Sequence, residues 1–239
     1  MSWTQRERIE ELAWANRILC NENVLDAFGH VSVRSAENPN HFLQSRFQSP
    51  QLVKPEDIVT ISLDGEVISP EGAPVYGERL LHGMIFEARP DVHAVVHTHA
   101  LPLVPFSASK YELKPLYHMA CMFGEGLPVY DDYDVSEGML IRDHKQGRRL
   151  ARVLGAHKGL LMRGHGAVVV GRNIRDAVVS SVYLVANAQA VLNARLLGDE
   201  PKFLSREECR AATEIILRDA ALERAWNYFK EHVPPYHRI

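Results

Sequence analysis

Apolar residues recur at helical spacing near the start of the chain and again in its last third. Residues 7–23 follow a period of about 3.6, which predicts an amphipathic helix. Residues 78–89, which stop before Pro90, and residues 173–197, rich in Ala, Val and Leu, are predicted to be helices as well. The pattern Ser-Arg-Glu-Glu at 205–208 is a capping box and predicts the start of a last helix.

Between these helices the pattern changes to that of strands. Residues 28–34 alternate apolar and polar positions, as a half-buried strand does. Residues 57–68 are predicted to form a hairpin, because two β-rich runs flank Asp64-Gly65. Residues 93–99 are predicted to form a buried strand, and 158–170 a second hairpin with a polar turn.

The remaining segments carry weaker patterns. Residues 37–55, rich in Asn, Pro, Gln and Ser, are predicted to be mostly loop, and the tail 232–239 to be irregular. Hairpins outnumber βαβ units, so we expect a single α/β domain over 1–239 with a largely antiparallel sheet covered by helices.

The composition and net charge of the chain argue against several classes of function. Apolar residues make up 46% and charged residues 24%, as in ordinary globular proteins, and the net charge of −3 shows no basic stripe. This argues against nucleic acid or an anionic membrane surface as partner. No apolar run approaches the roughly 18–20 residues that span a bilayer, and the N-terminus has no signal-peptide pattern. The odd, scattered Cys20, Cys121 and Cys209 suit free thiols in a reducing cytoplasm, where we expect the protein.

The histidines supply the candidate chemistry. His97 and His99 are two apart in a predicted buried strand, so their side chains share a face. Two buried imidazoles without partners would be costly, and a shared metal ion would satisfy both. The alternative is that they form hydrogen bonds within the core.

Two more residues fit the same interpretation. His165 stands between two glycines in the predicted polar turn, where it can point into a pocket; the alternative is a solvated turn histidine. Glu78 opens a predicted helix; the alternative is a surface carboxylate that interacts with the helix dipole.

Together these residues resemble the class II aldolase and adducin family, from the first helix to about residue 215. The resemblance rests on the motifs at 29–34, 77–82, 89–91, 94–99 and 164–166. It implies an α/β/α sandwich in which Glu78, His97, His99 and His165 surround one divalent metal ion per subunit. Zinc, manganese, iron and cobalt all suit such ligands. It also implies a homotetramer with active sites at subunit interfaces.

The chain departs from the sugar-phosphate aldolases of this family. Those enzymes bind phosphate with an Asn and two serines, and His30, Tyr76 and Gly77 stand at those positions here. The sequence is more similar to members that decarboxylate hydroxylated aromatic or heteroaromatic dicarboxylates. Two alternatives are an aldolase for a non-phosphorylated hydroxy-carbonyl substrate and a non-catalytic adducin-like interaction module.

The resemblance also suggests catalytic roles. Glu78 would be the fourth ligand or a base. His30 is a candidate for proton transfer, because imidazole titrates near working pH, or it makes an orienting hydrogen bond. Tyr133 lies near the position of the aldolase proton-donor tyrosine, which a neighbouring subunit provides, and Tyr130 competes with it.

Three residues are candidates for binding a substrate carboxylate. Arg79 and Arg163 could pair with it through two parallel hydrogen bonds each. Their alternatives are a surface arginine on a helix and a charge beside a turn. Ser32 is a further candidate for a hydrogen bond to the same small-molecule carboxylate substrate.

Overall fold

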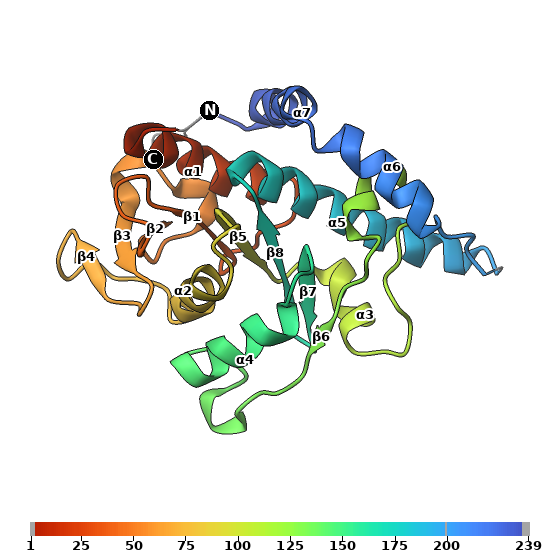
Figure 1. Cartoon of the computed structure of the whole chain (residues 1–239), viewed down its shortest axis with the longest axis horizontal. Helices are drawn as coiled ribbons and strands as arrows, with labels where there is room; N and C mark the ends of the chain where they lie inside the picture. The colour runs from red at the N-terminus through yellow and green to blue at the C-terminus, as the bar shows by residue number, and fades with distance from the viewer. Residues whose placement is uncertain (1–2, 199, 236–239) are drawn as a thin grey trace.

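The computed structural model describes residues 3–198 and 200–235, and a single sheet runs through its centre (Figure 1). The strands are β1 His30–Arg34, β2 His41–Ser45, β3 Ile58–Ser62, β4 Val67–Ser69, β5 Ala94–Thr98, β6 Val129–Tyr130, β7 Gly159–Met162 and β8 Gly166–Gly171. They follow the order β4-β3-β2-β1-β5-β8-β7-β6. All neighbours are antiparallel except β6 and β7.

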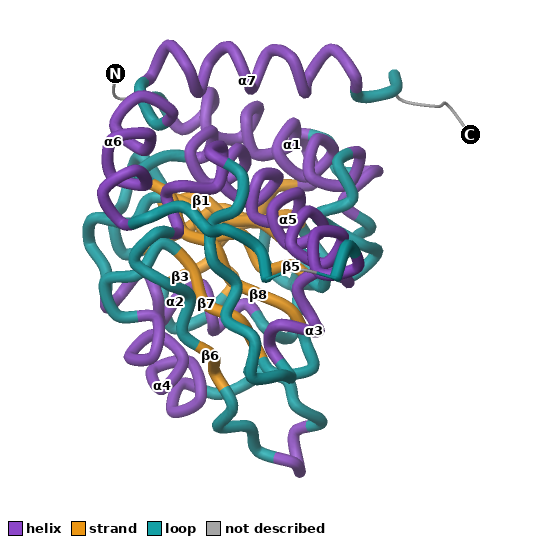
Figure 2. Tube along the Cα trace, turned by 90° about the vertical axis from the view of Figure 1, so that its right-hand side faces the viewer, coloured by secondary structure: helices purple, strands orange, loops and turns teal. Residues whose placement is uncertain are grey.

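Helices cover both faces of this sheet. They are α1 Gln5–Asn21, α2 Arg79–Ala88, α3 Val104–Ser107, α4 His144–Leu154, α5 Ile174–Leu196, α6 Arg206–Ile216 and α7 Asp219–His232. α1, α5 and α7 lie on one side and α2 and α4 on the other, and each layer has its own apolar core (Figure 1; Figure 2). The expected α/β/α sandwich with a mainly antiparallel sheet is confirmed.

Alternation along β1 places its polar side chains on the α2 side. Val31 and Val33 belong to the core beneath α1 and α5. His30 and Ser32 therefore face the opposite layer. β1 pairs with β5 so that His30 stands opposite His97. The sheet register thus brings two of the singled-out histidines together on one face.

The structure corrects one property of β1. The alternation predicts a half-buried strand, but all five residues of β1 are buried. The strand lies in the middle of the sheet, with helices over both faces. Its polar residues are satisfied by hydrogen bonds inside the protein and not by solvent.

Two elements go beyond the sequence predictions. Within the segment predicted to be mostly loop, β2 pairs with β1 on one edge and β3 on the other, although Gln44 and Ser45 are polar. Strand pairing along both edges of β2 makes this segment a strand although its own sequence pattern is weak. α4 is mostly polar, and only a narrow stripe that includes Leu150 and Leu154 is buried against the α2 layer.

The capping box at Ser205 is confirmed, but the last helix is two helices. The Ser205 hydroxyl accepts from the amide of Glu208, whose carboxylate accepts from the Ser205 amide. α6 ends at Ile216 and α7 begins at Asp219. Residues 236–239 of the predicted irregular tail lie outside the described residues.

The length and apolar composition of α5 would let it cross a membrane, although we expected no such segment from the sequence. In the fold, 56% of its apolar window is buried. It packs against α1, β5 and β8. α5 is therefore the core helix of its layer.

The turn between β7 and β8 is held against the end of β5 by a glycine. A Cβ atom on Gly166 would stand 1.9 Å from the carbonyl oxygen of Thr98. Only glycine allows the two backbones to approach this closely. The preceding residue, His165, is thereby fixed beside the strand that carries His97.

Gly166→Ala is expected to destabilise the protein by about 3 kcal/mol or more, because a backbone oxygen cannot move aside as a flexible side chain would. Chemical denaturation measures the change. Gly72→Ala is the matched control, because Gly72 has a φ of +72° and no atom within 4 Å of the added methyl group. That variant should lose only about 1 kcal/mol from backbone strain. Equal losses in the two variants would contradict the close packing at Gly166.

Candidate metal centre

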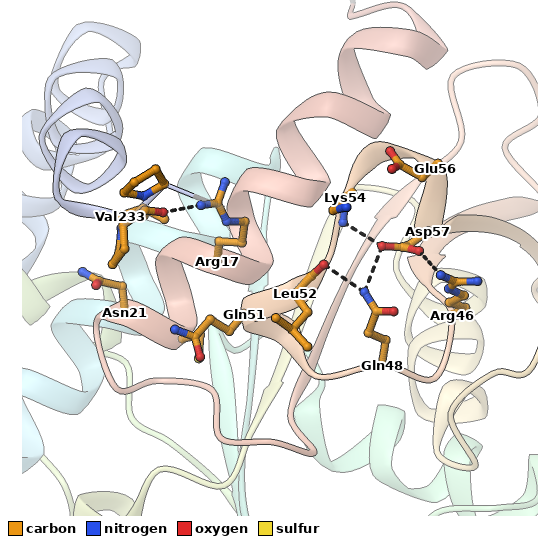
Figure 3. Close-up of a pocket in the computed structure, with 13 residues that line it drawn as sticks. Arg17, Asn21, Arg46, Gln48, Gln51, Leu52, Lys54, Glu56, Asp57 and Val233 are labelled. Carbon is orange, nitrogen blue, oxygen red and sulfur yellow. Dashed lines mark hydrogen bonds and ion pairs between the residues drawn. The ribbon is translucent and has the colours of Figure 1, made fainter. Parts of the chain in front are cut away.

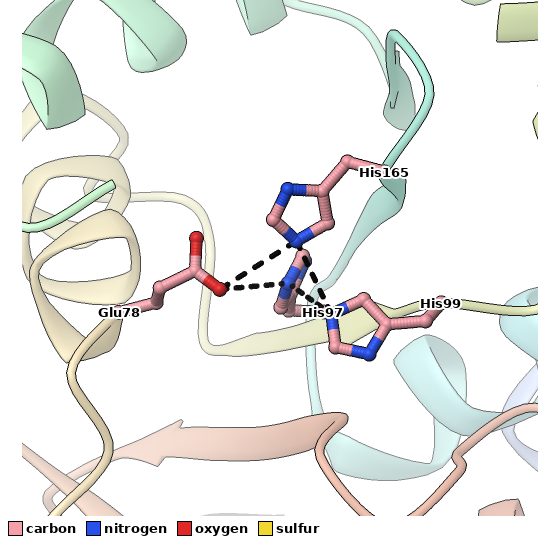
Figure 4. Close-up of side chains that lie close together, drawn as sticks. All are labelled: Glu78, His97, His99 and His165. Carbon is pink, nitrogen blue, oxygen red and sulfur yellow. Dashed lines mark hydrogen bonds and ion pairs between the residues drawn. The ribbon is translucent and has the colours of Figure 1, made fainter. Parts of the chain in front are cut away.

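Four side chains from three separate segments meet at one point (Figure 4). Nε2 of His99 lies 3.1 Å from Nε2 of His97 and 3.2 Å from Nε2 of His165. Oε2 of Glu78 is 3.5 Å from Nε2 of His97 and 3.6 Å from Nε2 of His165. The four ligand atoms all lie within 4.8 Å of one another.

Glu78 occupies the N-cap position of α2, but its side chain does not cap the helix. Its Oε1 accepts a hydrogen bond of 2.9 Å from the amide of Ile141, and its Oε2 faces the histidines. Burial alone would raise the pKa of Glu78. The neighbouring imidazoles of His165 and His97 outweigh burial and hold this pKa well below its ordinary value. Glu78 is therefore a carboxylate at neutral pH.

Each histidine is oriented through its other ring nitrogen. Nδ1 of His97 lies 3.3 Å from the carbonyl oxygen of Ala167. Nδ1 of His165 lies 3.2 Å from the carbonyl oxygen of Met139. Because a carbonyl oxygen only accepts, both rings carry their proton on Nδ1 and direct an Nε2 lone pair into the cluster.

His99 completes this arrangement with a charged partner. Its Nδ1 donates to Oδ1 of Asp26 over 3.1 Å. Burial and the neighbouring His97 lower the pKa of His99, against the opposing effect of Asp26. His99 is thus neutral at pH 7, as a metal-ligating imidazole must be.

The donor set fits a divalent cation. Three Nε2 lone pairs that face one another have no proton to share, so without a cation they repel. A tetrahedral ion with metal–nitrogen bonds of 2.0–2.1 Å would separate its ligands by roughly 3.3 Å, close to the spacing of these atoms. Imidazole and carboxylate ligands suit zinc, manganese, iron and cobalt. His97, His99, His165 and Glu78 are the residues that would hold the ion.

A buried hydrogen-bonded chain lies next to the cluster. Nδ1 of His30 is 2.7 Å from Nε2 of His82, and Nδ1 of His82 is 2.6 Å from Oγ of Ser32. The Gln44 amide nitrogen is 3.4 Å from the same Nδ1 of His30. In the tautomer in which Nδ1 of His30 accepts from His82, Ser32 donates to His82 and the proton of His30 is on Nε2. That nitrogen makes no hydrogen bond within the described residues.

These contacts change two expectations. Burial, and then His82 and His97, hold the pKa of His30 well below its ordinary value, so His30 is neutral at pH 7 and does not titrate there. Ser32 is fully buried, and its hydroxyl is used by His82. Because this hydroxyl already has a partner, the structure does not favour the substrate-binding role predicted for Ser32 from the sequence.

Of the two competing tyrosines, Tyr133 lies against the cluster. Its ring stacks on His165, with ring centroids 6.2 Å apart and an interplanar angle of 12°. Its hydroxyl oxygen is buried and has no hydrogen-bond partner in the described part of the chain. Tyr130 instead donates to the carbonyl oxygen of Asp132. Tyr133 reaches the site of its own chain, whereas the family resemblance implied a tyrosine from a neighbouring subunit.

Arg79 and Arg163 already have hydrogen-bond or ion-pair partners in the protein. The guanidinium of Arg79 donates to the carbonyl oxygens of Gly65 and Tyr76. Arg163 forms an ion pair with Asp131 on the surface. Because both guanidinium groups already have partners, the structure does not favour the carboxylate-binding roles predicted for these arginines from the sequence.

Sequence analysis did not single out two residues that support the site. His82 follows Glu78 by four residues, so the two lie on the same face of α2, and this spacing is visible in the sequence. Asp26 lies in a loop far from the histidines in the chain, and only the folded structure brings it to His99.

A large cavity lies elsewhere. It has a volume of about 840 Å³ and contains none of the four ligands (Figure 3). Its main acidic group, Asp57, is already bonded to Gln48, the Lys54 amide and Arg46. We therefore assign the candidate chemistry to the histidine cluster, where the Nε2 atoms of three histidines face one another without hydrogen-bond donors between them.

Comparison with known proteins agrees with this geometry. The family model "Class II Aldolase and Adducin N-terminal domain" matches residues 10–192. The chain belongs to the class II aldolase and adducin family. The proteins to which the chain is similar include decarboxylases and an aldolase.

Two curated relatives are decarboxylases. Decarboxylase tropJ of Talaromyces stipitatus is 32% identical, with 90% of each chain covered. The 3,4-dihydroxyphthalate decarboxylase of Arthrobacter keyseri is 28% identical over 72% of this chain and 73% of that protein. Among solved structures, an aldolase II superfamily protein from Pseudomonas syringae superimposes with a TM-score of 0.82 at 24% identity, covering 98% of this chain and 94% of that one. This last likeness concerns the fold.

Asp26→Asn is expected to weaken metal binding about tenfold or more, because replacing the charged partner of a ligating histidine lowers its basicity. The amide oxygen can still accept from the Phe28 and Gly29 amides, as Asp26 Oδ1 does, so the loop should keep its shape. Metal titration against a competing chelator measures the affinity. Asp91→Asn, which alters a surface ion pair with Arg89, is the control. Unchanged affinity in Asp26→Asn would contradict the orienting role of this residue.

Proposed function

We propose that the protein is a metal-dependent lyase that decarboxylates a hydroxylated aromatic or heteroaromatic carboxylate or dicarboxylate. The observation that carries the proposal is the convergence of three histidines and Glu78 in a chain 32% identical to a decarboxylase over 90% of its length. The relative that acts on 3,4-dihydroxyphthalate supports the substrate class. A divalent cation held by these ligands supplies Lewis-acid chemistry, because it withdraws electron density from substrate oxygens while a carbon–carbon bond breaks.

The reaction needs a proton donor from the chain. When the carboxylate leaves as carbon dioxide, the electrons of the broken bond stay on the ring carbon, and a proton must replace the lost group. Burial and the nearby Glu78 raise the pKa of Tyr133, so its hydroxyl keeps its proton at neutral pH. Tyr133 donates that proton to the ring carbon and recovers one from solvent.

His30 acts as a neutral hydrogen-bond donor. The chain through His82 and Ser32 leaves its Nε2 proton free for a substrate oxygen. Since the ring does not titrate near pH 7, this donor is present throughout the neutral range. Glu78 would help to hold the cation and would balance part of its charge. Substrate enters from the side of His99, the most exposed of the three histidines at 21%.

His97→Ala is expected to abolish stoichiometric metal binding and to reduce carbon dioxide release by at least about 100-fold, the loss that removal of a single electrostatic stabiliser can cause. Metal analysis and gas evolution from hydroxylated dicarboxylates measure the two effects, and circular dichroism checks the fold. His232→Ala on α7, across the sheet, is the control.

Three outcomes would contradict the proposal. Normal turnover in His97→Ala would refute the site. Absence of divalent metal after reconstitution of the native protein would favour a non-catalytic module. Aldehyde release from an aldol substrate, without carbon dioxide from any carboxylate, would favour an aldolase.

We also infer a homotetramer whose subunits meet around the active sites. Large apolar side chains stand exposed close in sequence to site residues: Phe28 is 63% exposed, Leu101 80% and Val135 87%. They lie two residues from His30, His99 and Tyr133 respectively. A contiguous exposed apolar surface is typical of a face that a partner covers, and we infer that these three residues belong to such a face.

Leu101→Asp is expected to shift the native mass from tetramer toward smaller species, because a charge cannot be buried in an apolar interface without a partner. Light scattering coupled to gel filtration measures the mass. Leu196→Asp, at the end of α5 and 85% exposed, should leave the mass unchanged. A wild-type monomer would overturn the inference.

A further inference from the structure

Arg142 is tied to the metal centre through the backbone. The residue before it, Ile141, donates its amide to Glu78 over 2.9 Å. The amide of Arg142 itself donates to Oε1 of the buried Gln146, in the first turn of α4, over 3.0 Å. The backbone on both sides of the Arg142 side chain is thus held in place relative to Glu78.

The guanidinium of Arg142 lies beside Gly77, the residue before Glu78. Its Nε is 3.5 Å from the point at which a Cβ atom on Gly77 would stand. Gly77 directly precedes Glu78, and both Gly77 and Arg142 are exposed. Because Gly77 has no side chain, nothing from that residue covers the guanidinium.

This side chain has unused hydrogen-bonding capacity. Within residues 3–198 and 200–235 its guanidinium takes part in no hydrogen bond or ion pair. In contrast, Arg79 and Arg163 both have partners. Arg142 is therefore an arginine near the cluster that can bind an incoming anion without first breaking an existing contact.

We propose that Arg142 binds a carboxylate of the substrate and so selects for carboxylated ligands. The inference rests on the proposed function and specifies which residue recognises the substrate. A planar guanidinium can hold a carboxylate through two parallel hydrogen bonds. The positive charge of Arg142, beside Gly77, would add to that of the bound cation in attracting a dicarboxylate.

The test compares equilibrium binding of two probes to the metal-loaded protein. Phthalate carries two carboxylates on a benzene ring, and catechol carries two hydroxyls and no carboxylate. In Arg142→Ala the dissociation constant of phthalate should rise at least about tenfold, whereas that of catechol should change less than about twofold. Arg142→Lys should recover part of the phthalate affinity, because it restores the charge but not the paired geometry. Isothermal titration calorimetry measures both probes.

The control is Arg148→Ala, which also removes one positive charge. Arg148 lies on α4 and forms an ion pair with Glu87. This variant should leave phthalate binding unchanged. Metal content and melting temperature should be the same in all variants. Wild-type phthalate affinity in Arg142→Ala, an equal loss for both probes, or no phthalate binding by the wild type would overturn the assignment.

This experiment separates the two proposals. If the wild type binds phthalate through Arg142 but releases no carbon dioxide from hydroxylated dicarboxylates, the decarboxylase proposal fails and the carboxylate site stands. If carbon dioxide is released and Arg142→Ala changes neither the KM nor phthalate binding, the Arg142 proposal fails alone. Where both hold, Arg142→Ala should raise the KM and leave kcat nearly unchanged.

Discussion

The centre of this protein depends on where three imidazole protons are held. Two main-chain carbonyls and the carboxylate of Asp26 keep those protons on Nδ1, so the Nε2 lone pairs of His97, His99 and His165 point at one another. A neutral core would not tolerate this arrangement, and a bound cation would stabilise it. The sheet register, the β7–β8 turn and the position of Glu78 all serve to keep these nitrogens together.

Much of this could be predicted from the sequence because it depends on local periodicity. Two histidines separated by one residue share a face of any strand, and a Gly-His-Gly turn is visible without a fold. The helices α1, α2 and α5 and the hairpin around Gly65 follow from similar local rules. The convergence of His165 with the other ligands needed the family resemblance, since no local rule relates residues 66 positions apart.

The predictions that the observed contacts do not favour, and the strand that was missed, concern residues whose partners are distant in the chain. Arg79 and Arg163 have the right chemistry for a carboxylate, but their actual partners are set by tertiary structure. Ser32 alternates with apolar residues as a solvated position would, yet α2 covers it and supplies His82 as its partner. β2 was missed because its strand pairing comes from neighbours on both edges and not from its own composition.

The first turn of α2 lacks a side-chain N-cap because its N-cap residue belongs to the candidate metal centre. An N-cap side chain normally satisfies one of the free amides of the first turn, and Glu78 forgoes that role to face the histidines. A substitution that restores an N-cap bond would gain that bond but would lose the acceptor of the buried Ile141 amide. In a related chain, loss of that glutamate would remove a candidate metal ligand, and the same architecture would persist only where another group satisfies the Ile141 amide.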